Sequence, residues 1–294
     1  MKFSDYTKMT GCVKATEKQL CAVRDKIGNW DSDSKPPVAN YADFRDWLAG
    51  ELSGGPRWWD FPNAGELFTH NQGSLGSCAG FSVANAAMVT LIQQVQMASE
   101  QKPVLMNPFV CWCKSKGGST AGGQTMPDMA LAINEYGQWP VFIAGEYSPN
   151  LRWKSEWDSA ESQDIASFYQ AGISEISYEG DELAEEIFFI CKHRHAVFFG
   201  ATACISEDGQ VTRCGGHAQA FGGYDEVTDC IGYLNSWGDI YTGLPVKFAT
   251  LIDKTTLKRF CRYIFDPYAV TYAEAPYDTT IEPTLEMNDG LGES

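Results

Sequence analysis

The feature that most constrains the fold is a glycine-rich stretch, residues 71–82, that leads directly into a long helical pattern. After Cys78 the apolar residues recur at the spacing of an α-helix, at Phe81, Ala84, Ala87, Met88, Leu91, Ile92 and Val95. Ser77 is predicted to cap this helix, because a serine hydroxyl can accept one of the unpaired backbone N–H groups at its start. The pattern therefore predicts a helix with one apolar face and a cysteine in its first turn.

Cys78 lies where the dipole of the predicted helix favours a thiolate over a thiol. The thiolate is the nucleophilic form of cysteine, so this position suits covalent catalysis. A cysteine beside an apolar helix is, however, more often a small buried hydrophobic residue. A catalytic interpretation therefore requires a base, a group that orients the base, and donors for an oxyanion.

Two later stretches supply candidates for those groups. His217 opens a short strand-like run, and Asn235 follows another such run at 230–234. Together with residues 72–82 they resemble the papain family of cysteine proteases, whose members carry Q-G-x-C-G-S-C-W-A-F-S, then H-A with a following G-Y, then N-S-W-G. In that family the His and Asn follow the Cys by about 130–150 residues, a spacing that His217 fits and Asn235 slightly exceeds.

The resemblance implies an α+β fold of two lobes. One lobe is helical and is built around the helix that begins at the cysteine. The other is an antiparallel, β-barrel-like lobe that carries His217 and Asn235. The papain-like domain is expected to span 56–270, after an N-terminal extension or short pro-segment at 1–55 and before an acidic tail at 271–294.

The resemblance also implies a role for each motif residue. Cys78 would attack a peptide carbonyl, and His217 would take the thiol proton and later pass it to the leaving amine. Asn235 would orient the imidazole, as the third member of a triad does. The side-chain amide of Gln72 and the backbone N–H of Cys78 would form the oxyanion hole, and Trp237 would shield the Asn–His hydrogen bond from water.

A substrate-binding wall is expected downstream of the first helix. Family members have a Gly-Gly pair there, which Gly122 and Gly123 match, since glycine lets another chain approach closely. Met126 follows as the expected lining of the main specificity pocket, and an apolar lining would favour Leu, Val or Phe in the substrate. An ordinary surface loop is an equally good interpretation of these glycines.

Three residues depart from the family pattern. Leu75 replaces the first motif cysteine, which removes one half of a typical family disulfide, and Ala79 replaces an aromatic residue beside the nucleophile. Gly216 stands where a polar residue often precedes the histidine. The resemblance also makes Cys214 and Cys261 the cysteines to examine for a disulfide, because relatives often bridge these regions.

The remaining patterns predict helices and strands in the order expected of two lobes. Helices are expected at 14–27, from Asn107 onward, at 127–133 with Gly137 as the closing residue, and at 181–190; strands are expected at 196–205, 210–214, 217–221, 230–234 and 263–265, with an Asp208-Gly209 turn joining the first two.

Cysteine content and charge narrow the function. The chain has ten cysteines but no secretory signal, so mostly free thiols and a cytoplasmic location are expected. The fragments at 111–113 and 191–195 contain Cys or His without the paired spacing of zinc ligands, so neither metal nor cofactor is expected. The net charge of −16 argues against nucleic acids and anionic membranes as partners. Protein or peptide substrates are what the resemblance implies.

Two other functions stay open at this point. The chain could be a papain-fold structural or binding component of a viral or cellular assembly, such as a virion, with little or no proteolysis. It could also use the same Cys–His pair for acyl transfer or deamidation, because the acyl-enzyme is common to these reactions and to hydrolysis.

Overall fold

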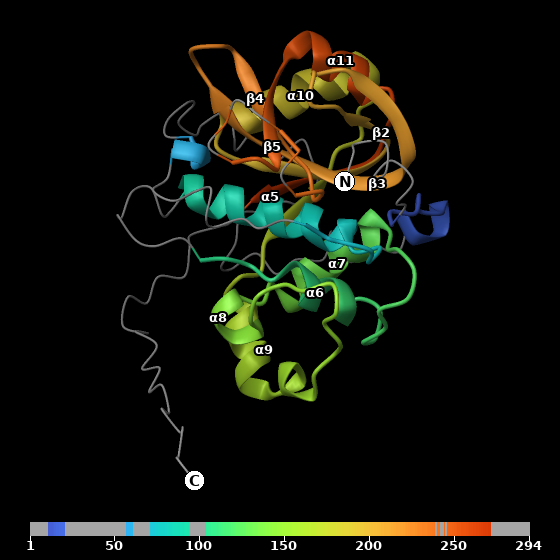
Figure 1. Cartoon of the computed structure of the whole chain (residues 1–294), viewed down its shortest axis with the longest axis vertical. Coiled ribbons are helices and arrows are strands. Elements are labelled where there is room, and N and C mark those ends of the chain that lie inside the picture. The colour runs from blue at the N-terminus through green and yellow to red at the C-terminus, as the bar shows by residue number, and fades with distance from the viewer. Residues whose placement is uncertain are drawn as a thin grey trace.

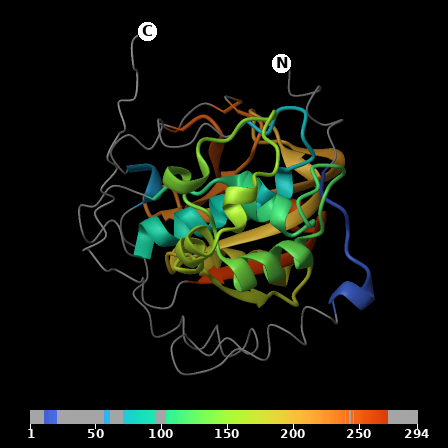
Figure 2. The same cartoon turned by 90° about the horizontal axis from the view of Figure 1, so that it is seen from below.

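The computed structural model describes residues 11–20, 57–60, 71–94, 104–238, 240–241, 244 and 246–271. In these ranges a helical lobe and a β lobe lie on opposite sides of one long central helix, α5 (Cys78–Gln94) (Figure 1). Seen from below, α5 in cyan and the green helices lie in front of the orange strands (Figure 2). The predicted two-lobe α+β fold is confirmed.

The helical lobe contains α5 and the shorter helices that follow it. These are α6 (Pro108–Lys114), α7 (Met126–Tyr136), α8 (Val141–Ala144) and α9 (Ala160–Ser167), with a 3-10 turn at η3 (Ser155–Asp158). A second 3-10 turn, η1 (Trp58–Asp60), packs against the sheet, where Trp58 donates to the Gly222 carbonyl. The Asn107 side chain accepts from the Phe109 N–H at 2.8 Å and caps α6. Gly137, at φ 79°, ends α7. Both helices therefore begin or end where the sequence predicts.

The β lobe is a six-stranded antiparallel sheet in the order β1-β6-β2-β3-β4-β5. Its strands are β1 (Gly172–Glu175), β2 (Ala196–Ile205), β3 (Val211–Asp225), β4 (Cys230–Leu234), β5 (Ala249–Asp253) and β6 (Ile264–Thr271). The predicted β2–β3 hairpin and β4 are confirmed. The two runs predicted at 210–214 and 217–221 form one strand, β3, because a register shift opposite Ala201–Ala203 absorbs the glycines between them.

Helix α5 is buried on every side, since each residue from Cys78 to Gln93 is buried. One hydrophobic cluster joins α5 to α6, α7 and the inner face of the sheet. A second joins the outer face of the sheet to α10 (Gly180–Lys192) and α11 (Lys254–Cys261), which lie above the strands in Figure 1. A helix that is apolar around most of its circumference belongs in such a central position.

Several predictions concern residues that are only partly described. Of the helix predicted at 14–27, residues 17–20 are helical and 21–27 lie outside the described ranges. The predicted boundary between 55 and 56 also lies outside them. Within the described ranges, no helix combines the length and apolar character needed to cross a bilayer.

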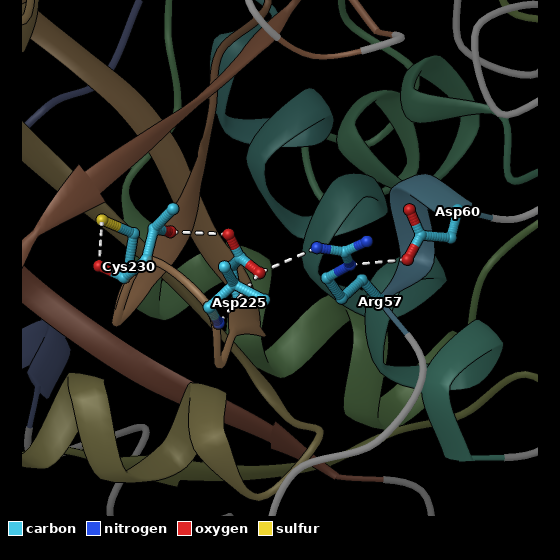
Figure 3. Close-up of polar contacts among 6 residues, drawn as sticks. Arg57, Asp60, Asp225 and Cys230 are labelled. Carbon is cyan, nitrogen blue, oxygen red and sulfur yellow. Dashed lines mark hydrogen bonds and ion pairs between the residues drawn. The ribbon is translucent and has the colours of Figure 1, made fainter.

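Asp225, at the end of β3, connects the sheet to the turn η1 (Figure 3). Its carboxylate accepts from Arg57 at 2.7 Å and from the Thr228 hydroxyl at 2.6 Å, and Arg57 also contacts Asp60 at 2.5 Å. The Thr228 hydroxyl and the Arg57 guanidinium hold the pKa of Asp225 below its usual range. The stabilisation from this carboxylate is therefore present at neutral pH and is lost as the pH falls through the lowered pKa.

We predict that Asp225→Asn lowers the free energy of unfolding by about 1–2 kcal/mol at pH 7, because a nearly buried charge-assisted network loses its negative charge and one of its two accepting oxygens. Glu156→Gln is the matched control, since its ion pair with Lys154 is solvent-exposed, and it should cost less than about 0.5 kcal/mol. Urea unfolding of both variants measures the difference. Equal losses would contradict the assigned role of Asp225.

Candidate active site

Cys78 is the first residue of α5, as predicted. The Ser77 carbonyl accepts the first helical hydrogen bond, from the Phe81 N–H at 3.2 Å. The Ser77 hydroxyl, however, lies 3.1 Å from the Tyr147 hydroxyl, so the predicted side-chain cap is replaced by a contact to the loop after α8. The start of the helix is therefore anchored from outside the helix.

His217 and Asn235 come together because β3 pairs with β4. The Ala220↔Leu234 pairing brings the two residues to the same end of the strands. His217 Nε2 lies 2.8 Å from Asn235 Oδ1, and the ring of Trp237 stacks on the imidazole with centroids 4.4 Å apart and planes 20° apart. All three side chains are buried. The structure thus brings these three predicted residues together, in the arrangement that shields the hydrogen bond from water.

Cys78 meets the same strand from the side of α5. The backbone N–H of Ala218, the residue after His217, reaches the Cys78 sulfur. One helical turn further on, the Ser82 hydroxyl donates to the Gln219 carbonyl at 2.5 Å. The remaining ring nitrogen of His217, Nδ1, is buried and has no hydrogen-bond partner among the described residues. Cys78 therefore contacts the backbone beside the base, but no hydrogen bond joins its sulfur to His217 Nδ1, and the imidazole keeps one nitrogen unoccupied.

Burial sets the charge of both groups. It raises the pKa of Cys78 to about 11, against a smaller opposing effect of backbone N–H groups. It lowers the pKa of His217 to about 4, and the hydrogen bond to Asn235 only partly offsets this. The expected thiolate is therefore wrong for this state of the molecule, because desolvation outweighs the helix dipole. At neutral pH the pair is a thiol and a neutral imidazole.

Gln72 lies in the loop before α5 and is fixed at four points. Its Nε2 donates to the Leu75 carbonyl at 3.0 Å, its Oε1 accepts from the Ser236 hydroxyl at 2.5 Å, and its backbone N–H donates to the Ser236 carbonyl at 2.9 Å. The Tyr147 hydroxyl donates to the Gln72 carbonyl at 2.8 Å. One amide hydrogen of Gln72 is thus occupied, and the second remains for the predicted oxyanion hole.

An extended segment, residues 11–13, runs through the site. The N–H groups of Gly11 and Cys12 both lie 3.1 Å from the Gly216 carbonyl. On the other side, Gln124 donates to the Gly11 carbonyl at 2.9 Å and accepts from the Val13 N–H at 3.2 Å, which makes a parallel bridge. The segment therefore joins β3 in one lobe to the loop before α7 in the other.

Glycines make this close approach possible. A side-chain carbon on Gly123 would lie 1.8 Å from the Gly11 carbonyl oxygen, and one on Gly216 would lie 2.2 Å from the Cys12 carbonyl oxygen. A side-chain carbon on Gly11 would lie 2.9 Å from the Cys78 sulfur. Gly123 thus faces another stretch of backbone, and that stretch belongs to the same chain, whereas a side-chain carbon on Gly122 would have no neighbour within 4 Å in the described part of the chain. The role of the pair as a substrate-binding wall stays a prediction.

The other residues singled out in the sequence, Met126, Cys111 and Cys113, are buried in helices. Met126 is the first residue of α7 and its side chain is fully buried, so its role in a pocket stays a prediction. Cys111 and Cys113 are buried in α6. Within the described ranges, no group of three or more Cys, His, Asp or Glu side chains is placed to hold a metal ion.

The nine described cysteines are free thiols. Cys214 lies against Cys204 beneath Trp237, whereas Cys261 belongs to the cluster under α10 and α11. The disulfide suggested between Cys214 and Cys261 is therefore not present. The hairpin register pairs Cys204 with Thr212, and this explains why Cys214 meets a neighbour on β2.

Sequence reasoning missed the segment at 11–13 and the residues that support the triad, namely Tyr147, Tyr233, Ser236 and Tyr241. A three-residue extended segment has no periodicity to detect. The tyrosines lie in apolar runs that indicate only burial. Ser236 stands inside the N-S-W-G motif and could have been found from its position beside Asn235.

No protein-family model and no curated protein matches the sequence. Solved structures do match. Xylellain, a cysteine protease from Xylella fastidiosa, has a TM-score of 0.54 and 13% identity, and covers 91% of this chain and 97% of its own. ProCathepsin B S9 from Trypanosoma congolense has a TM-score of 0.52 and 13% identity, over 94% of this chain and 89% of its own. At this identity the likeness is one of fold, and the chain has the fold of papain-like cysteine proteases.

Proposed function

We propose that this protein is a cysteine peptidase that cleaves peptide bonds through a thioester on Cys78. The observation that carries the proposal is the position of His217. Its imidazole is held by Asn235 and covered by Trp237, and its Nδ1 has no hydrogen-bond partner among the described residues. The next residue on the same strand, Ala218, contacts the Cys78 sulfur. The cysteine protease activity named for xylellain supports the same chemistry.

The proposed residues act in sequence during acylation and hydrolysis. His217 Nδ1 takes the thiol proton as the Cys78 sulfur bonds to the substrate carbonyl carbon. The oxyanion is stabilised by the Cys78 N–H and the free Gln72 amide hydrogen. His217 then gives the proton to the leaving amine as the C–N bond breaks. Water, activated by the same nitrogen, hydrolyses the thioester and returns the thiol. Asn235 keeps the imidazole in place throughout.

The segment at 11–13 makes the present state a blocked one. Its backbone bridges Gly216 and Gln124, and a side-chain carbon on Gly11 would lie 2.9 Å from the Cys78 sulfur. A substrate carbonyl must come within about 3–3.5 Å of the attacking atom, and Gly11 prevents this. We infer that the stretch predicted as a short pro-segment, 1–55, inhibits the enzyme through these residues. The name proCathepsin B of one structural relative agrees with such a form.

The proposed block can be tested by releasing it. Gly11→Leu places a side chain against the Cys78 sulfur and the Gly76 carbonyl, so the segment should leave the groove. We expect labelling of Cys78 by a peptidyl thiol-reactive probe, and cleavage of a casein substrate, to rise at least about tenfold, as for loss of about 1.4 kcal/mol of docking free energy.

Two variants control this experiment. Val13→Ser alters a half-exposed side chain of the same segment and should leave the labelling rate near that of the wild type. Cys78→Ala, combined with Gly11→Leu, should lose both labelling and cleavage. Cleavage that survives loss of the Cys78 sulfur would disprove the peptidase mechanism, and an unchanged rate in Gly11→Leu would disprove the block.

A separate prediction concerns the pH dependence of Cys78 alkylation. In the blocked chain the pKa of Cys78 is about 11, so the thiolate fraction and the rate of alkylation by iodoacetamide should rise about tenfold per pH unit between pH 6 and 9. In Gly11→Leu, water reaches the pair, desolvation falls, and the thiolate is stabilised by the protonated imidazole. Its rate should therefore level off at a lower pH. Superimposable pH profiles would contradict the assignment of the shift to burial under the segment.

A further inference from the structure

Two buried tyrosine hydroxyls lie behind Asn235, on the side away from His217. Asn235 Nδ2 is 3.2 Å from the Tyr241 hydroxyl and 3.4 Å from the Tyr233 hydroxyl. Both rings are fully buried, and they pack edge to face with centroids 6.0 Å apart. The direction of each hydrogen bond can be deduced, because the network ends on backbone groups whose roles are fixed.

The direction at Tyr241 follows from the end of β2. Its hydroxyl lies 2.7 Å from the Ile205 carbonyl, and a carbonyl can only accept. Tyr241 therefore donates its single proton to Ile205. Only its lone pairs remain for Asn235, so the Asn235 atom that faces it must be a donor.

The direction at Tyr233 follows from the same strand. The Ile205 N–H donates to the Tyr233 hydroxyl oxygen at 3.2 Å. Gln219 Nε2 donates to the Ala203 carbonyl at 3.0 Å, which leaves Gln219 Oε1 to accept the Tyr233 proton in a short contact. Tyr233 therefore also has only lone pairs for Asn235. Burial raises the pKa of both tyrosines, so each keeps its proton at neutral pH.

These directions fix the amide of Asn235. Its NH₂ group must face the two tyrosines, and its Oδ1 must face His217, where the Ser236 N–H also donates to it at 2.7 Å. Because Oδ1 can only accept, His217 must carry its proton on Nε2. The neutral ring then has a bare Nδ1. This is the buried nitrogen that has no hydrogen-bond partner among the described residues.

We propose that Tyr241 and Tyr233 are positioning residues that set the tautomer of His217, with the direction imposed by the backbone at the end of β2. They touch neither the nucleophile nor the imidazole and act through the Asn235 amide. The catalytic consequence rests on the proposed function, since a bare Nδ1 is what a base beside Cys78 needs. The tautomer itself does not depend on that function.

The test is the ¹⁵N chemical shifts of His217 in the full chain with labelled histidine, assigned by comparison with His217→Gln. In the wild type the Nε2–H tautomer should dominate. In the double variant Tyr233→Phe, Tyr241→Phe, the amide NH₂ loses both acceptors, and the share of the Nδ1–H tautomer should rise by about 3- to 10-fold, the factor for one or two buried hydrogen bonds. In the Gly11→Leu background, kcat should fall in proportion to the loss of the Nε2–H tautomer, while KM stays within about twofold.

Tyr224→Phe is the matched control, because it also removes a tyrosine hydroxyl. That hydroxyl donates to Asp229 at a distance of 2.8 Å and takes no part in the site. It should change neither the tautomer nor kcat. If the double variant fails to fold, the single variant Tyr241→Phe, which removes one oxygen atom, decides by the same two measurements.

A wild-type His217 that is mainly Nδ1–H would overturn the proposal. So would a folded Tyr241→Phe or double variant with the wild-type tautomer ratio. Absence of peptidase activity in every variant would instead count against the proposed function, and the ¹⁵N shifts would still decide the role of the two tyrosines.

Discussion

The buried hydrogen bond between His217 and Asn235 depends on how β3, β4 and α5 are arranged. The strands β3 and β4 must pair in one register to bring its two ends together, and α5 must lie beneath β3 to place Cys78 next to it. A polar pair without water is costly unless each remaining donor and acceptor is satisfied. The tyrosine hydroxyls and the Ser236 N–H meet that requirement for the Asn235 amide, whereas His217 Nδ1 stays unsatisfied among the described residues, and so the β lobe has a polar centre inside an apolar shell.

Much of this arrangement could be predicted from the sequence. Local sequence signals predict three helix ends, namely the start of α5 at Cys78, the start of α6 at Asn107 and the end of α7 at Gly137. These signals depend on neighbouring residues and not on distant contacts. The β2–β3 hairpin follows from alternation and a turn signal. The pairing of His217 with Asn235 was predicted from the family resemblance, because no local rule connects residues on different strands.

The parts that could not be predicted depend on contacts between distant segments. Ser77 turns its hydroxyl to Tyr147, which lies seventy positions away. Cys78 is a thiol here because it is fully buried, with Gly11 among its neighbours, and nothing in the sequence around Cys78 indicates this. The helix dipole and the burial act in opposite directions on the same sulfur, and only the tertiary structure decides which effect is larger.

The close contact between the segment at 11–13 and the groove has an evolutionary consequence. Gly11, Gly123 and Gly216 each leave room for backbone rather than for a ligand side chain. The three positions are therefore constrained jointly, although they are more than a hundred residues apart along the chain or in opposite lobes. A lineage that keeps the segment in the groove must keep all three glycines. A lineage that deletes it releases Gly123 and Gly216 together, and these sites then become free to acquire side chains suited to a new substrate.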